Sequence, residues 1–560
     1  MRAALLALAI VLALAPGAAA QTPTSPARYD VPPPGWERAP ADLMQAVAGR
    51  AEVRRARRGH ELTYGRVYYK SKAKRQWQVS FFAPPEHRGD RTRALSETVV
   101  DDRSGLVLES WTGYKVEWTM ARGYAGAFGR VANALWVWLP LCALFVLPFA
   151  RPPLRLLHLD LAVLLAFSIS YAFFNASEIG VSVPLVYPLL AYLLARMLGI
   201  AISRARGREP PPLRLTVPVR ALGIAAVFVL GFRTGLNVIG SNVIDVGYAS
   251  VIGADRAGAG EGIYGHFPVD NARGDTYGPV LYYAYVPFEA LLPWSGRWDD
   301  LPAAHAAAVA FDLLTAGGLW VLGRRLRGPD LGALLAYAWA TFPFTLLVAN
   351  TNTNDGLVAL LVTAAMLALA RPALRGAVVA AAALTKFAPL VLAPLFATYR
   401  DGEAARAPRV IAVTMAAFAA VAALVLAPVA FGDGLGTFYD RTLGFQADRG
   451  SPFSVWGLYD LPGRTAALAA ALVLAVVVAF VPRRRDPVGV AALGAAALIA
   501  LQLALEHWFY LYLVWFLPLA LVALLSGRRI ASIDSAPDGR EPEAVRMTTA
   551  ISHGSTSEES

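Results

Sequence analysis

The chain has 560 residues, of which 56% are hydrophobic, and its mean hydropathy of +0.47 excludes an ordinary soluble globular protein. A lipid bilayer must therefore be its main solvent, and a polytopic membrane protein is expected. The net charge of +11 comes mostly from short arginine clusters between apolar segments, which is the pattern that orients membrane helices rather than one that binds nucleic acid.

Residues 1–20 have the anatomy of a secretory signal peptide, with Arg2, a short apolar core and an alanine-rich end. Such a peptide would carry the following segment across the membrane, and an uncleaved membrane anchor is the alternative. Residues 21–38 read as a proline-rich linker.

Residues 39–125 are predicted to form a small α+β extracytoplasmic domain. Residues 75–83 and 96–111 alternate as strands do, with a turn at residues 103–105. The segment resembles a PepSY-like domain, and the residues that carry the resemblance are Trp77, Val79, Asp101, Ser104, Gly105 and Val107. Known relatives modulate or inhibit partners, so the resemblance implies an accessory role. A small sheet that only caps the outer face is the alternative.

The rest of the chain is dominated by apolar segments, most of them long enough to cross a bilayer core of about 30 Å. They lie at residues 131–150, 158–175, 182–201, 216–234, 302–322, 331–349, 355–371, 376–399, 409–430, 464–481, 487–505 and 508–526. We expect accessory membrane helices in residues 126–215, a main membrane module in residues 216–526 and a polar, disordered cytoplasmic tail in residues 527–560.

The arginine clusters predict the topology. With residue 21 outside, the clusters at 151–155, 204–208 and 324–327 all become cytoplasmic, provided that residues 278–294 do not cross the membrane. Three prolines and Glu289 within that segment favour an interfacial or re-entrant helix.

A second segment, residues 376–399, is predicted to be a broken hairpin. As a single crossing it would place the downstream arginines outside, against the positive-inside rule. Lys386 and Pro389 lie near its middle, where a hairpin would reach the outer face. The fold class is therefore a mostly α polytopic bundle of about 11 crossings with re-entrant or interfacial helices, and with a cytoplasmic C-terminus.

Residues 237–302 form a long acidic, aromatic and glycine-rich stretch between apolar segments, and loops of this length on membrane proteins are usually functional. Asp245 follows closely on the preceding membrane helix and could act as a general base toward a hydroxyl group. An ordinary acidic residue at the start of the next helix is the alternative. Asp255 is followed by Arg256, so an exposed ion pair is expected there.

Other polar and aromatic residues are candidates for binding an acceptor or a sugar. Asp275 could bind an acceptor or merely cap a turn, and the turn at residues 350–356 could bind sugar hydroxyls or be a solvated connection. The candidate contacts are Tyr248, Tyr264, Asp275, Tyr277, Asn354 and Asp355.

Lys386 and His507 are candidates for binding a phosphate group. Lys386 would place a cation at the depth of the lipid headgroups, although a lysine that only extends its charge to the interface is equally expected. His507 could donate to the same phosphate or belong to the aromatic belt of the membrane. The single cysteine, Cys142, excludes a cysteine metal site, and no other metal-ligand cluster is visible.

Several of these residues carry a family resemblance. Asp245 and Tyr248 form a D-x-x-Y element, and Gly262 and Tyr264 a G-x-Y element, similar to the first extracytoplasmic loop of the GT-C superfamily of glycosyltransferases. Within that superfamily the chain resembles glycosyltransferase family 87, whose members are similar to polyprenyl-phosphate-mannose-dependent mannosyltransferases. The three segments that carry this resemblance begin at Thr276, Asn354 and Glu506 and contain Tyr277, Lys386 and His507, and the resemblance covers residues 216–526. The family often has glutamine where this chain has Asn354 and Asp355, which puts sugar contacts there in doubt.

The resemblance implies a membrane glycosyltransferase of the plasma membrane. It would transfer a sugar, of which mannose is one candidate, from a polyprenyl-phosphate donor to a hydroxyl acceptor on a glycan or glycolipid at the outer face. Asp245 would be the base, Lys386 and His507 would stabilise the leaving phosphate, and no cofactor or metal is implied. A transporter or flippase, and a membrane sensor or assembly protein, are the alternatives.

Overall fold

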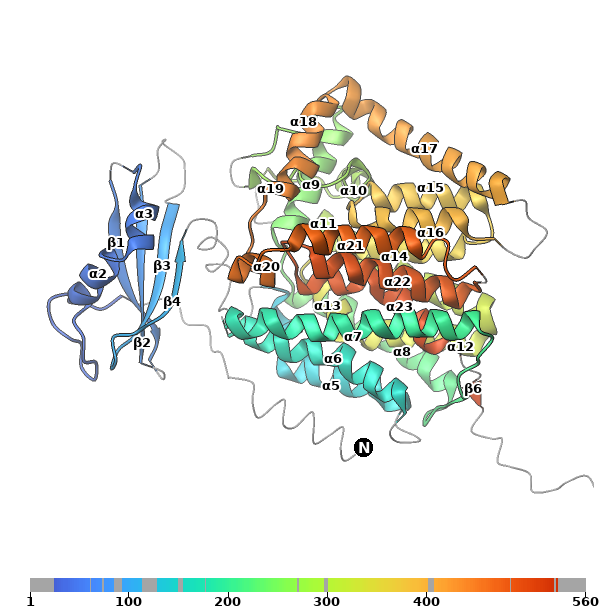
Figure 1. Ribbon diagram of the computed structural model, residues 1–560, viewed down its shortest axis with the longest axis horizontal. Helices are drawn as coiled ribbons and strands as arrows, with labels where there is room; N and C mark the ends of the chain where they lie inside the picture. Colours follow the sequence, from blue (N-terminus) through green and yellow to red (C-terminus); the bar gives the residue numbers. More distant parts are fainter. Residues whose placement is uncertain are drawn as a thin grey trace, which may run out of the picture.

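The computed structural model describes residues 25–60, 62–72, 75–84, 93–112, 128–149, 155–176, 178–268, 271–296, 301–400, 407–483, 485–527 and 530–531. The predicted signal peptide and most of the predicted tail lie outside these residues. The described part forms a small α+β domain and a large helical bundle (Figure 1).

The N-terminal domain is a four-stranded antiparallel sheet preceded by two short helices. The helices are α2 (Pro40–Ala48) and α3 (Ala51–Arg57), and the strands, which pair in chain order, are β1 (Tyr64–Ser71), β2 (Gln76–Ala83), β3 (Arg93–Asp101) and β4 (Val107–Thr112). Alternate residues of β2, including Trp77 and Val79, face a core shared with Val53 and Val67. The predicted strands are therefore present, whereas the PepSY-like resemblance remains a prediction.

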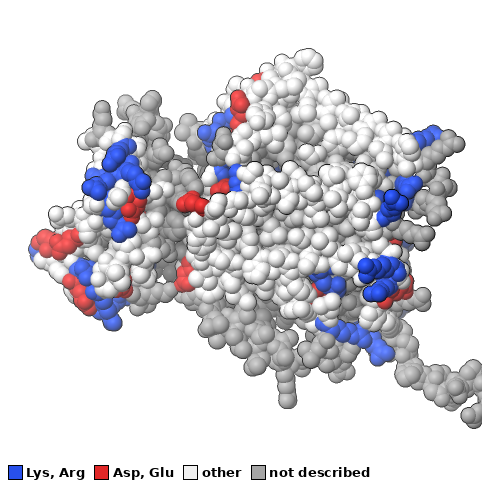
Figure 2. Space-filling view, in the orientation of Figure 1, with Lys and Arg blue, Asp and Glu red and all other residues white. Residues whose placement is uncertain are grey.

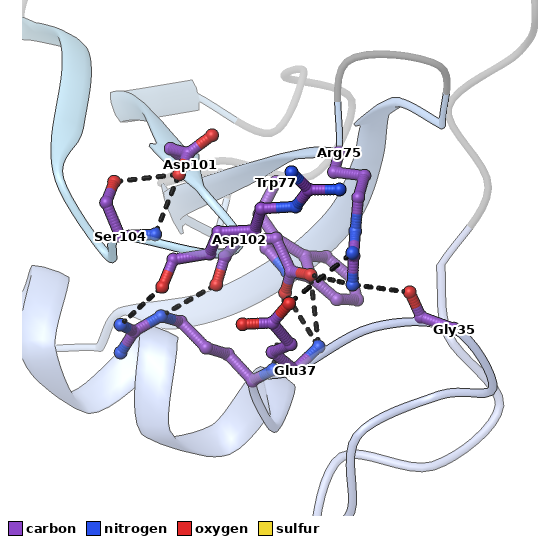
Figure 3. Close-up of polar contacts among 9 residues, drawn as sticks. Gly35, Glu37, Arg75, Trp77, Asp101, Asp102 and Ser104 are labelled. Carbon is purple, nitrogen blue, oxygen red and sulfur yellow. Dashed lines mark hydrogen bonds and ion pairs between the residues drawn. The ribbon is translucent and has the colours of Figure 1, made fainter.

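Two neighbouring aspartates fix the β3–β4 hairpin and its contact with the N-terminal segment (Figure 3). Asp101 accepts hydrogen bonds from the backbone N–H and the hydroxyl of Ser104, at 2.8 and 2.7 Å, as the predicted turn requires. Asp102 is fully buried and accepts from Trp77 Nε1 at 2.8 Å, Arg75 Nη2 at 3.1 Å and the backbone N–H of Glu37 at 3.0 Å. A buried carboxylate with this many donors holds strand, turn and linker together.

The bundle contains six helices that are long and apolar enough to cross a membrane, or seven if one bent pair counts as a span, within the described residues. The six are α6 (Leu156–Asn175), α7 (Ile179–Ala205), α8 (Val219–Gly240), α11 (Pro302–Arg327), α17 (Ala407–Phe431) and α22 (Pro487–Ala504). The bent pair is α12 (Pro329–Thr341) and α13 (Pro343–Asn350), which meet at 60°. Figure 2 shows a broad band on this face of the bundle that lacks charged side chains, as a lipid-facing surface does.

Shorter elements complete the bundle. The helices are η1 (Arg130–Asn133), α5 (Leu135–Val146), η2 (Leu147–Phe149), α9 (Asp245–Gly258), α10 (Pro279–Leu291), α14 (Asp355–Leu367), α15 (Pro372–Ala383), η4 (Ala388–Leu392), α16 (Ala393–Thr398), α18 (Leu435–Tyr439), η5 (Asp440–Gly444), α19 (Phe445–Asp448), α20 (Val455–Tyr459), α21 (Arg464–Val477), η6 (Tyr510–Tyr512) and α23 (Leu513–Leu525). Strand β5 (Leu213–Arg214) pairs with β6 (Ile530–Ala531) in parallel. Several predicted crossings correspond to these short helices, so the expected count of about 11 remains a prediction.

The arginine clusters of different segments come together at one end of the bundle. Arg204 Nε donates to Asp486 at 3.0 Å, and Arg485 Nη2 donates to the backbone oxygen of Thr398 at 3.2 Å. Arg327 lies 3.7 Å from Glu209. Arginine side chains gather toward this end, on the right of Figure 2. The helices expected to be accessory are integral to the bundle, because α7 packs along α22.

Residues 372–399 fold back on themselves as a broken hairpin. Helix α15 ends at Ala383, and the chain returns through η4 and α16. The two ends of the hairpin meet, because Arg375 Nη2 donates to the backbone oxygen of Tyr399 at 3.2 Å. At the apex, the backbone N–H of Gly278 donates to the oxygen of Thr385 at 3.1 Å, which joins the start of α10 to the hairpin. This is the geometry that the hairpin prediction required.

A buried ion pair that the sequence analysis did not identify stabilises the bend between α12 and α13. Pro343 cannot donate a backbone hydrogen bond, so carbonyl groups of the preceding turn lose their helical partner. Arg233 Nη1 donates to the oxygens of Trp339 and Ala340 at 3.2 and 2.9 Å, and Arg233 Nη2 donates to Asp312 at 2.7 Å. Arg233 thus donates hydrogen bonds to the carbonyl groups freed at the bend and also pairs with the buried carboxylate of Asp312.

Candidate functional site

Three short helices, α14, α15 and α23, meet at the end of the bundle opposite the arginine clusters. They contain 12 or 13 residues each, and at 1.5 Å per residue they span about 20 Å, well short of the bilayer core of about 30 Å. Their ends at this side therefore lie recessed below the ends of the longer helices. The side chains at these ends form the floor of the candidate site.

Lys386, at the apex of the hairpin, is the centre of this floor. Its Nζ lies 2.6 Å from Asp355 Oδ1, at the start of α14, and Trp515 Nε1 donates to the same oxygen at 2.7 Å. The ammonium group also faces the rings of Tyr277, Tyr512 and Trp515, with 5.1–5.6 Å between Nζ and the ring centroids. Only 7% of Lys386 is exposed. The side chain is therefore held inside the protein and does not extend to the interface as a snorkelling lysine would.

Asp245 is the first residue of α9 and faces the same recess. A glycine two residues later allows this placement, because a Cβ on Gly247 would lie 2.2 Å from the backbone oxygen of Asn352. The backbone N–H of Ile244 also donates to the oxygen of Thr351 at 3.2 Å, so the polar turn before α14 holds the start of α9. The turn predicted at residues 350–356 is thus an internal support and not a solvated connection.

Asp245 is exposed as a residue, yet protein atoms surround its carboxyl group closely. Burial is the largest influence on its pKa and raises it, while the positive charges of Arg449 and Lys386 lower it. The two observations agree if the carboxylate lines a narrow recess that water reaches. A carboxyl group with a raised pKa is better matched to accepting a proton near neutral pH than a fully solvated one.

Arg449 and His507 complete the set of titratable groups in the recess. Arg449 Nη2 lies 3.4 Å from His507 Nε2, and Ser451 Oγ lies 2.8 Å from His507 Nδ1. A guanidinium group can only donate, so this contact places the imidazole proton on Nδ1, toward Ser451. Burial, followed by the charges of Arg449 and Lys386, holds the pKa of His507 well below its usual value. The imidazole is therefore neutral at physiological pH.

The structure thus brings together five of the predicted residues: Asp245, Tyr277, Asp355, Lys386 and His507. It adds Arg449, Tyr512 and Trp515, which the sequence analysis did not identify. Arg449 lies in a polar segment between short helices, where no periodicity or spacing connects it to the other residues.

The remaining candidates are buried in supporting positions. Tyr248 packs against Trp294, and the hydroxyl of Tyr264 donates to the backbone oxygen of Tyr277 at 2.9 Å. Asn354 Nδ2 donates to Ser250 Oγ at 3.1 Å. These partners leave the three side chains inside the protein, and their predicted contacts with an acceptor or sugar remain untested predictions.

Two ion pairs in the long loop, those of Asp275 and Arg256, have partners that the sequence did not predict. Asp275 is fully buried and forms a two-pronged pair with Arg441, at 2.6 and 2.7 Å, which ties the loop to η5. Arg256 pairs with Glu261 at 3.2 Å and, within the described residues, forms no salt bridge with Asp255, although, against the larger raising effect of burial, its charge still lowers the pKa of Asp255. The reason is helical geometry, because adjacent residues on α9 do not face each other.

Among the described residues, no group of three or more His, Cys, Asp or Glu side chains is arranged to hold a metal ion. The recess contains the carboxylate of Asp245, the cations of Lys386 and Arg449, the imidazole of His507 and aromatic rings.

Comparison with known proteins bears on this chemistry. No curated protein matches the chain. Residues 276–505, however, match the family model of glycosyltransferase family 87, and this range includes Tyr277, Asp355, Lys386 and Arg449. His507 lies two residues beyond its end, and Asp245 lies 31 residues before its start. Residues 276–505 are therefore similar to glycosyltransferase family 87, and this match supports a membrane glycosyltransferase.

Proposed function

We propose that the protein transfers a sugar from a polyprenyl-phosphate donor to a hydroxyl group of an acceptor, with Asp245 as general base. The observation that carries the proposal is the arrangement of the recess, where the Asp245 carboxylate shares its surroundings with Lys386, Arg449 and His507. Glycosyl transfer needs a group that accepts a proton and a separate set of groups that stabilise a leaving phosphate.

In this mechanism the acceptor hydroxyl gives its proton to Asp245 while its oxygen bonds to the anomeric carbon of the sugar. The bond from that carbon to the phosphate oxygen breaks, and the phosphate leaves with the electron pair, so that the anomeric configuration inverts. Arg449 and Lys386 stabilise the charge that develops on the phosphate. His507 accepts a hydrogen bond from Arg449 through Nε2 and so positions this cation, while its own contact with the phosphate stays a prediction.

The depth of the recess favours a donor anchored in the membrane. Because the helices that carry the site floor are short, we expect the floor to lie below the membrane surface, at the depth of the phosphate of a lipid-linked donor. A soluble nucleotide sugar lacks a lipid anchor that would hold its phosphate at this depth. Mannose is the sugar that we propose first, because of the resemblance to mannosyltransferases.

We also propose that the recess faces the outside of the cell and the arginine-rich end the cytoplasm. The positive-inside rule supports this orientation, since arginines of several segments share the opposite end. Cysteine substitution at His266, which is exposed on the long loop, should allow labelling from outside intact cells. Cysteines at residues 371 and 400 should react only after the cells are opened. The reverse pattern would overturn the orientation.

The substrate proposal can be tested with purified protein and radiolabelled donors. Polyprenyl-phosphate mannose, polyprenyl-phosphate glucose and the corresponding nucleotide sugars are supplied in parallel with a membrane glycolipid extract as acceptor. We expect labelled product only from a polyprenyl-phosphate donor. Transfer from a nucleotide sugar alone would contradict the donor class.

A further inference from the structure

A second cavity lies at the arginine-rich end of the bundle, at the far end of α23 from the recess. It has a volume of about 360 Å³, is half-open, and is bordered by the start of α6, the end of α7 and the end of α23. Its lining is divided between apolar and charged groups. The apolar residues are Leu156, Ile200, Pro210, Pro211, Ala523 and Leu524, and the basic ones are Arg155, Arg196, Arg204 and Arg208.

Two of the four arginines are already neutralised by carboxylates. Arg196 Nε lies 2.8 Å from Asp160, which is buried, and Arg204 pairs with Asp486. Both side chains therefore have fixed positions and form part of the wall.

The other two arginines keep their charge available. Arg155 Nη1 donates to the backbone oxygen of Pro212 at 2.9 Å, and no carboxylate among the described residues pairs with Arg155 or Arg208. The one acidic residue in the lining, Glu209, lies toward Arg327. The cavity thus presents two guanidinium groups that pair with no carboxylate in the described part of the chain, beside apolar side chains.

We propose that this cavity binds the headgroup phosphate of an anionic phospholipid. Guanidinium groups bind phosphate oxygens through paired hydrogen bonds, and apolar walls suit the glycerol and the first part of the acyl chains. The volume is at the lower end of small-molecule sites, which fits a headgroup rather than a whole lipid. Basic pockets between membrane helices are suited to anionic lipid headgroups.

The proposed lipid site is separate from glycosyl transfer and does not depend on the proposed donor. Helix α23 begins beside Tyr512 in the recess and ends beside Leu524 in the cavity. Its 13 residues place the two sites about 20 Å apart along the helix. A bound lipid would join α6, α7 and α23 at this end and stabilise the bundle.

Native mass spectrometry of the full-length protein tests the proposal. Detergent-solubilised, delipidated protein is titrated with phosphatidylglycerol or with phosphatidylcholine of the same acyl chains. We expect tighter binding of phosphatidylglycerol. Arg208→Gln should weaken the binding of phosphatidylglycerol about fivefold, and the double variant Arg208→Gln with Arg155→Gln should weaken it about thirtyfold. Both estimates assume that each arginine contributes equally, by the amount typical of a basic residue near anionic lipids.

Arg206→Gln is the matched control, because Arg206 is an exposed neighbour on the same stretch of chain that does not line the cavity. Arg208 is also exposed, so its substitution should leave the fold intact. Equal effects of the Arg206 and Arg208 changes, or equal binding of the two lipids, would overturn the proposal. Displacement of phosphatidylglycerol by an equal concentration of inorganic phosphate would show a site for free phosphate and would also overturn it.

Discussion

Lys386 Nζ lies 2.6 Å from Asp355 Oδ1, and this pair joins the apex of a broken hairpin to the first residue of α14. Both side chains are almost completely buried, with 7% and 1% exposed. Asp355 thereby holds the lysine in the recess and offsets its charge. The sequence suggests sugar contacts for Asp355, and its position adds that it orients Lys386, the cation that we propose to bind the phosphate.

Replacing Asp355 by asparagine should destabilise the protein by about 3–5 kcal/mol, because it leaves a buried ammonium group without its carboxylate. Transfer should also fall, since Lys386 loses its fixed position. Thermal unfolding and initial transfer rates measure the two effects.

The double variant Asp355→Leu with Lys386→Met separates these roles. Replacing both charges by apolar side chains of similar size should restore much of the stability but none of the transfer activity. A double variant with near wild-type transfer would show that the lysine has no part in the reaction.

Gly278→Ala should disrupt the contact between α10 and the hairpin. A Cβ there would lie 1.9 Å from the backbone oxygen of Leu384, and a backbone atom cannot move aside easily. We expect a loss of about 1–3 kcal/mol in unfolding free energy and a lower transfer rate, because Tyr277 and Lys386 would separate.

Gly235→Ala is the control for this change. Gly235 lies within α8 with no atom within 4 Å of a Cβ, so alanine should be neutral or slightly stabilising. A comparable loss of activity in both variants would mean that the Gly278 contact is not specific.

Arg449→Ala should move the acid limb of the pH–rate profile to higher pH. The guanidinium charge lowers the pKa of Asp245, so its removal raises that pKa, and the carboxylate becomes protonated at a higher pH. Activity that depends on the ionised carboxylate of Asp245 is then lost at a higher pH than in the wild type. The plateau rate should drop about 10²–10³-fold through weaker phosphate stabilisation.

The pH dependence of kcat/KM measures this shift, because it reports the groups of the free enzyme. Arg220→Ala serves as control, since Arg220 is an exposed cation at the start of α8. A shift of the acid limb to lower pH in Arg449→Ala would contradict the assigned electrostatic coupling.

Asp102→Ala should unfold the N-terminal domain selectively. The change leaves Trp77, Arg75 and two backbone N–H groups without their common acceptor, at a cost of roughly 3 kcal/mol. Limited proteolysis should then cleave residues 39–112 faster, while an accessory domain would leave transfer largely intact. The exposed pair of Asp30 with Arg28 provides the control, since Asp30→Ala should change little.

Much of the site can be predicted from the sequence, because a bilayer restricts where charged residues can lie along a membrane protein. Lys386 in an otherwise apolar segment, and arginines that required that segment to return, together indicated a hairpin apex. The observed contact between Arg375 and Tyr399 has the geometry of such a return. Asp245 was singled out because it closely follows a membrane helix, and it lies in the recess.

Other features depend on tertiary contacts that leave no local pattern. Arg449 reaches His507 across 58 residues of sequence, and Arg233 reaches Asp312 across 79. Neither pair has a spacing that a helix or strand would impose. Helix lengths were also overestimated, because residues 355–371 read as one apolar crossing while α14 ends at Leu367. The short lengths of α14, α15 and α23 nevertheless form the recess, because their ends lie below those of the longer helices.

The central claim is that Asp245 is the base of glycosyl transfer, and its most direct test is the transfer rate of Asp245→Asn. Asp255→Asn, on the same helix, is the matched control. We predict that Asp245→Asn lowers transfer by at least about 10²-fold with unchanged thermal unfolding, whereas Asp255→Asn retains activity. Wild-type transfer by a folded Asp245→Asn protein would contradict the account.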